Sequence, residues 1–150
     1  MRSLLRKLAV AATIAAAAGL TAVPASVAST ADAGRYFMLC MAHNCPTPSY
    51  VYGWITWYQR TVNLTGRVSS DSTPSTEYLQ ARFQAFAGTR QIGPTQTRTA
   101  TAGNGWAIDY SFVMGDPDLV GGVNKIKITL CEPDDQPGHM LCDLGHEFVR

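Results

Sequence analysis

The chain has 150 residues, of which 46% are hydrophobic and 15% are charged, and its formal net charge is +1 at pH 7. Because charges of both signs are dispersed along it, the sequence lacks the basic patch that binding to nucleic acid or to an anionic membrane requires. The length suits one ordinary domain and is too short for two.

The first residues have the pattern of a secretory signal peptide. Basic residues precede an uncharged apolar run over residues 8–20, and small residues with Ala-x-Ala spacing follow. Cleavage after Ala28 or after Ala33 fits this pattern, and we favour Ala33 because an apolar strand-like segment follows. The apolar run is shorter than the roughly 20 residues of a membrane-spanning helix. We therefore expect a signal peptide over residues 1–33 and a secreted, extracellular domain over residues 34–150, with no membrane anchor.

Four cysteines occur in the expected mature chain, namely Cys40, Cys45, Cys131 and Cys142. Thiols of exported proteins usually oxidise, and small domains gain stability from the resulting crosslinks. Proximity in the sequence favours pairing Cys40 with Cys45 and Cys131 with Cys142. We therefore predict two local disulfides.

Metal binding is the alternative use of these residues, since His43, His139 and His146 lie near the cysteines. Their spacings match no zinc-finger pattern, and oxidised cysteines cannot bind zinc. Asp116 and Asp118 have the oxygen ligands that calcium prefers, but two carboxylates around a proline are more typical of a turn. We expect no metal and no cofactor.

Alternation of apolar and polar residues indicates strands in the first half of the domain. It runs through residues 51–58 and again through residues 62–68, with a short turn near Gln59 and Arg60 between them. A turn-rich cluster follows at residues 69–76. This pattern predicts a β-hairpin.

Four further strands are predicted along the rest of the chain. Residues 78–85, 106–113 and 123–131 alternate clearly, whereas residues 95–101 are β-prone but polar, as is typical of an edge strand. No helical stripe is apparent. The pattern predicts an all-β fold, an antiparallel β-sandwich of immunoglobulin-like or related topology with six to seven strands, and leaves a barrel as the alternative.

Two segments, residues 83–92 and 111–132, together with the local cysteine pair after the last predicted strand, carry a resemblance to known proteins. About half of the mature chain resembles small secreted proteins of unassigned function from Streptomyces and related actinobacteria. The shared motifs are structural. The resemblance implies a secreted bacterial sandwich protein and implies no activity.

The aromatic segment at residues 50–58 is the main candidate for a binding site. If Val51 and Trp57 face the core, then Tyr52, Trp54 and Tyr58 lie on the outer face of the sheet, where flat rings can stack on sugars. The alternative is that strand aromatics fill the core. Trp54 is then buried, Trp57 lies near the rim, and Gly53 marks a bulge that changes the facing. We favour this second interpretation, the core interpretation, in which the aromatic residues of the segment fill the core.

No catalytic motif of the G-x-S-x-G or H-E-x-x-H kind occurs, so we expect no enzyme and assign no catalytic residue. Our leading hypothesis is a secreted, non-catalytic binding module for cell-wall or environmental polysaccharide that uses Tyr52, Trp54 and Tyr58. One alternative is a secreted protease inhibitor that presents the loop at residues 41–48. Another is an extracellular structural or partner-binding protein that pairs through the edge strand at residues 95–101.

Overall fold

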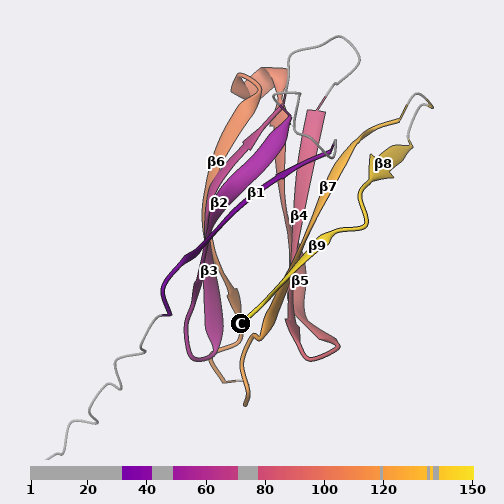
Figure 1. The fold of residues 1–150 in the computed structure, drawn as a ribbon. Coiled ribbons are helices and arrows are strands. Elements are labelled where there is room, and N and C mark those ends of the chain that lie inside the picture. Colours follow the sequence, from indigo (N-terminus) through magenta and orange to yellow (C-terminus); the bar gives the residue numbers. More distant parts are fainter. Residues whose placement is uncertain (1–31, 42–48, 71–77, 119, 135, 137–138) are drawn as a thin grey trace, which may run out of the picture.

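The computed structural model describes residues 32–41, 49–70, 78–118, 120–134, 136 and 139–150 (Figure 1). Within these residues, nine strands form two antiparallel sheets that pack face to face as a sandwich. The only helical element in the described ranges is a short 3-10 turn, Ala102–Asn104. The predicted all-β antiparallel sandwich is confirmed.

The two sheets have four and five strands. In the first sheet the order is β1 (Arg35–Cys40), β2 (Tyr50–Trp57), β3 (Thr61–Ser69) and β6 (Ala107–Gly115). In the second sheet the order is β5 (Arg90–Thr101), β4 (Tyr78–Ala87) and β7 (Lys125–Pro133), and both β8 (Met140–Cys142) and β9 (His146–Val149) pair with β7. Because β3 lies beside β6 and β4 beside β7, the connections cross between the sheets as in immunoglobulin-like sandwiches.

Six of the nine strands correspond to the six predicted segments, and β5 is the predicted edge strand, so the predicted count of six to seven strands is too low. Three strands were not predicted. In β1 the pattern is hidden because large apolar residues face both inward (Phe37, Leu39) and outward (Tyr36, Met38). Strands β8 and β9 have three and four residues, too few for a period of two to be recognised.

The core lies between the sheets and is built from alternate residues of their inner faces. In β2, Val51, Ile55 and Trp57 are buried. Phe83 of β4 crosses the layer and contacts the rings of Tyr110 and Phe112 of β6, at centroid distances of 5.0 and 5.2 Å. Full burial of each such apolar side chain contributes about 1.5–3 kcal/mol, so this inner layer fixes which face of each strand points outward.

Strand β2 keeps this alternation without interruption. Its pairing with β1 and with β3 shows no register shift, and Gly53 lies opposite Gly66 of β3. The bulge considered at Gly53 is therefore wrong. The glycine instead makes room for the buried side chain of Tyr110, whose hydroxyl donates a hydrogen bond to the carbonyl oxygen of Tyr52 (3.1 Å). Residues on either side of Gly53 consequently share one outer face.

The second sheet is tied at its edge by a disulfide. Cys131 of β7 and Cys142 of β8 are direct cross-strand partners and are joined to each other, as predicted. Cys40 is also disulfide-bonded, but its predicted partner Cys45 lies outside the described residues, as do residues 1–31 of the expected leader over residues 1–33. In the described part of the chain, no helix is long and apolar enough to cross a membrane.

Candidate ligand-binding face

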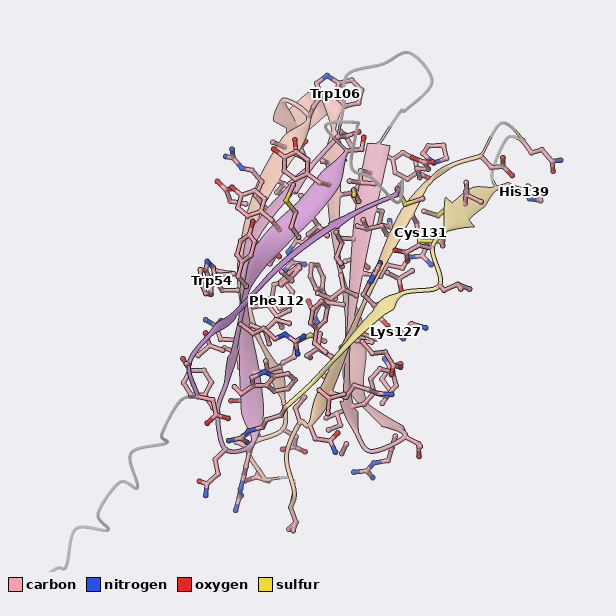
Figure 2. The ribbon with its side chains drawn as sticks, in the orientation of Figure 1. Trp54, Trp106, Phe112, Lys127, Cys131 and His139 are labelled. Atoms are coloured by element: carbon pink, nitrogen blue, oxygen red, sulfur yellow. A yellow bond between two sulfur atoms is a disulfide. The ribbon has the colours of Figure 1, made fainter. Side chains whose placement is uncertain are left out.

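The outer face of the four-stranded sheet carries a group of large apolar side chains that point away from the core. We call this group the aromatic face, and it consists of Tyr36 and Met38 of β1 with Tyr50, Tyr52 and Trp54 of β2. About half of the surface of Trp54 (51%), Tyr36 (50%) and Met38 (49%) is exposed. Figure 2 shows Trp54 on the outer side of this sheet, away from the second sheet.

The rings of the aromatic face form two pairs. Tyr36 and Trp54 are cross-strand partners, with their centroids 5.4 Å apart in an edge-on arrangement. Tyr50 and Tyr52 lie along β2, with their centroids 5.9 Å apart. Such ring pairs stabilise by about 0.5–1.5 kcal/mol beyond the area they bury. The pairs therefore hold the rings in fixed orientations while leaving part of each ring open to solvent.

The other half of the same sheet face is polar. In register, Trp54 lies opposite Thr65 of β3, which lies opposite Ser111 of β6. In the neighbouring row, Tyr52 lies opposite Arg67 of β3, and Arg67 lies opposite Asp109 of β6. Rings on β1 and β2 thus lie directly beside hydroxyl and charged groups on β3 and β6.

Arg67 and Asp109 form a two-point ion pair on this polar half. Nε of Arg67 donates to Oδ1 of Asp109 (2.6 Å), and Nη2 donates to Oδ2 (3.1 Å). The hydrogen bond to Arg67 lowers the pKa of Asp109, and the same bond raises the pKa of Arg67. Because both groups are exposed, the pair contributes little to the stability of the fold.

The residues predicted as ligand-binding do not all lie on this face. Tyr52 and Trp54 do, whereas Tyr58 follows the end of β2, in the turn before β3. There, the amide of Tyr58 donates to the carbonyl of Thr61 (2.8 Å), and its own carbonyl accepts from Arg150 (3.0 Å).

The core interpretation, which buried Trp54 and placed Trp57 near the rim, is wrong for both residues, because Trp54 is half exposed and Trp57 is only 4% exposed. Sequence reasoning did not include Tyr36, Met38 and Tyr50 in the site. Tyr50 shares the period-two spacing of Tyr52 and Trp54, and this signal could have identified it. Tyr36 and Met38 required the knowledge that β1 pairs with β2.

A groove continues from the aromatic face around the edge of β1 that points away from β2. It has a volume of about 600 Å³ and lies between Met38, Leu39, Cys40 and Met41 on one side and residues 141–146 on the other. The contact of Phe37 with Phe148, at 5.5 Å between centroids, joins β1 to β9. Met38 belongs to both the groove and the aromatic face, so the two surfaces are continuous.

The loop between β8 and β9, which forms one wall of this groove, is held by Asp143. Its Oδ1 accepts hydrogen bonds from the amides of Leu130 (3.1 Å) and Gly145 (2.9 Å), and its Oδ2 lies 3.5 Å from Nε2 of His146. A carboxylate that fixes main-chain groups in this way orders a turn. The loop that forms this wall of the groove is therefore held to β7 by the hydrogen bond from Leu130 to Asp143.

The described residues do not include three or more His, Cys, Asp or Glu side chains grouped as metal ligands. Cys131 and Cys142 are joined to each other, which removes both thiols from the zinc alternative. Oδ1 of Asp116 accepts from the amide of Asp118 (2.9 Å), as expected for a turn.

His43 and all but the first residue of the proposed inhibitor loop at residues 41–48 lie outside the described residues.

Comparison of the chain with family models, with curated proteins and with solved structures found no match.

Proposed function

We propose that this protein is a secreted, non-catalytic binding module that holds a polysaccharide on its aromatic face. The observation that carries the proposal is the pair of half-exposed rings of Trp54 and Tyr36, which are in contact and lie beside a polar strip on the same sheet. Soluble proteins rarely leave clustered apolar side chains exposed without a binding partner. A ligand that covers these rings gives them a function.

The division of the sheet face suits a sugar chain. Sugar rings have apolar C–H faces and a rim of hydroxyls, so they stack on aromatic side chains while their hydroxyls bond to polar groups. Stacking is favoured when the rings are already held in place, because each side chain that must be ordered otherwise costs about 0.5–1.5 kcal/mol on binding. The pairing of Tyr36 with Trp54 and of Tyr50 with Tyr52 supplies this order in advance.

The experiment is a pull-down of the purified domain with insoluble chitin, cellulose and peptidoglycan. We expect the wild-type protein to bind at least one polymer, and we expect Trp54→Ala and Tyr36→Ala to reduce binding by tenfold or more. Val113→Ala is the matched control, because Val113 is exposed on the same face but lies on β6. Equal binding by all of these variants would overturn the proposal.

Tryptophan fluorescence gives a second readout. Of the three tryptophans, Trp54 is exposed, Trp57 is buried and Trp106 is half-buried. Acrylamide should therefore quench mainly Trp54, and a bound glycan should protect it. The Trp54→Phe variant should lose the protectable signal, and protection that persists in this variant would place the glycan elsewhere.

Partner binding through β5 is a second candidate function. The observation that favours it is the position of β5 at the edge of the five-stranded sheet, where residues 95–101 are mostly polar and β4 is the only strand of the described residues that pairs with β5. Size-exclusion chromatography with light scattering tests self-pairing. A monomer across the micromolar range would rule out pairing between copies of this chain.

A further inference from the structure

The Arg67–Asp109 pair lies where a ligand stacked on the rings would meet it. Tyr52 of the aromatic face is the cross-strand neighbour of Arg67, and Arg67 is the neighbour of Asp109. The side chains of Arg67 and Asp109 are 44% and 73% exposed. A molecule that covers Tyr52 and extends toward β6 therefore comes within reach of both side chains.

The pair still has hydrogen-bonding capacity after its own two bonds are made. A guanidinium group has five N–H donors, and the bonds to Asp109 use two of them. Each carboxylate oxygen of Asp109 has a further lone pair. A hydroxyl both donates and accepts, so it can bond to the arginine and to the aspartate at the same time. The pair thus offers a rigid, planar contact for sugar hydroxyls.

The charge of the face limits which sugars fit. The described residues of β1, β2, β3 and β6 include three charged side chains, those of Arg35, Arg67 and Asp109. Arg35 lies over the Phe148 ring, 5.3 Å from its centroid, so Arg67 and Asp109 are the charged pair of the outer face. Each neutralises the other. A carboxylate or phosphate on the ligand would have to compete with Asp109 for Arg67 and would be repelled by Asp109 itself. A ligand without charge neither competes with Asp109 for Arg67 nor is repelled by Asp109.

Building on the proposed function, we infer that the aromatic face takes a neutral polysaccharide whose hydroxyls bond to the Arg67–Asp109 pair. The pair acts as a recognition element and adds little to the fold. Uronate-containing and phosphate-containing polymers are disfavoured ligands.

Affinity electrophoresis with soluble polymers tests this inference. The neutral probes are hydroxyethyl cellulose, glucomannan, arabinoxylan and a β-1,3-glucan, and the anionic probes are carboxymethyl cellulose, alginate and polygalacturonate. We expect retardation by at least one neutral polymer, none by the anionic ones, and little change between low salt and about 0.15 M salt, where charges further apart than about 8 Å are screened. Hydroxyethyl and carboxymethyl cellulose share a backbone, so they form a matched pair.

The possible failures are distinguishable. Stronger binding to anionic polymers, or binding that salt abolishes, overturns the neutral-ligand inference and leaves the proposed function standing. If no polymer in this panel and none in the pull-down binds, both are overturned.

Variants of the pair give an independent test. Asp109→Asn leaves Arg67 as an unneutralised cation, so we expect about tenfold weaker binding to the neutral polymer and new, salt-sensitive binding to the anionic ones. Glu147→Gln is the matched control. It breaks an ion pair on the second sheet, Glu147 with the partly buried Lys125 (2.9 Å). This variant should change neither the binding to the neutral polymer nor the binding to the anionic ones. An Asp109→Asn variant that folds and binds both classes like the wild type overturns the inference.

Discussion

Gly53 of β2 lies directly opposite Gly66 of β3, and the hydroxyl of Tyr110 from β6 fills the space that two side chains would otherwise occupy. A Cβ atom at position 53 would lie 2.6 Å from the Tyr110 hydroxyl, and one at position 66 would lie 2.7 Å from it. Each would also collide with a carbonyl of the neighbouring strand. This close contact lies at the point of β2 where Tyr52 and Trp54 project from the opposite face.

The glycine pair should be intolerant of substitution. We predict that Gly53→Ala and Gly66→Ala each lower the free energy of unfolding by about 1–3 kcal/mol, because the added methyl group overpacks the site against main-chain atoms. Urea denaturation followed by tryptophan fluorescence measures the change. Gly103→Ala is the control, because its Cβ atom meets nothing closer than 3.6 Å, and it should stay within about 0.5 kcal/mol of the wild type. Equal stability of all three variants would contradict the packing described for Tyr110.

Tyr110 should make the protein sensitive to alkali. Burial raises the pKa of the Tyr110 hydroxyl far above its ordinary value of 10.0. Above pH 10 the unfolded chain therefore loses this proton while the folded chain keeps it. Stability falls as pH rises wherever the folded state binds more protons. The contribution is fully present below pH 10 and decreases above it, by up to about 1.4 kcal/mol per pH unit.

Tyr110→Phe should remove this alkaline dependence. At neutral pH the variant should lose about 1 kcal/mol, because the hydrogen bond to the Tyr52 carbonyl is missing. Urea denaturation between pH 8 and pH 11 should then give a flatter stability profile for the variant than for the wild type. Parallel profiles would show that Tyr110 ionises as readily in the folded protein as in the unfolded chain.

The Cys131–Cys142 disulfide should stabilise the edge of the second sheet. The two cysteines are 11 residues apart, and closing a loop of this size in the unfolded chain contributes about 2–3 kcal/mol. We predict a loss of that size for the Cys131→Ala/Cys142→Ala double variant, measured by urea denaturation. Hydrogen exchange should also quicken for the amides of residues 140–142, because β8 pairs with β7 over only three residues. Unchanged exchange there would mean that the strand pairing holds β8 without the crosslink.

The position of Asp32 bears on where the predicted leader would be cleaved. Its amide donates to the Trp57 carbonyl (2.9 Å), and its carboxylate accepts from Nε of Arg150 (2.8 Å). Cleavage after Ala28 retains these contacts, whereas cleavage after Ala33 removes them. Although the sequence alone favours Ala33, we therefore predict that the exported protein begins at residue 29. N-terminal sequencing of protein secreted by a bacterial host measures this, and a chain that begins at Gly34 would contradict it.

Residue alternation was sufficient to predict the sandwich because its inner faces are plainly apolar. Val51 and Trp57 follow a strict period of two and are buried as that period requires. Trp54 and Tyr52 were placed on the outer face by the same period. The preference for burying Trp54 was wrong because it relied on the general tendency of aromatic residues to be buried. That tendency does not indicate which face of a strand a given residue occupies.

The pairing of strands that are distant along the chain could not be predicted from the sequence. Arg67 and Asp109 are separated by 42 positions, and Tyr36 meets Trp54 only because β1 lies at the edge of the sheet beside β2. A local pattern specifies which face of a strand is buried, since burial depends on the residue itself. It does not specify which strand is the neighbour or in what register, because these depend on how the whole chain crosses between two sheets. The residue pattern along the chain thus determined a disulfide-crosslinked β-sandwich, whereas only the pairing of distant strands brought the rings and the ion pair together on one face.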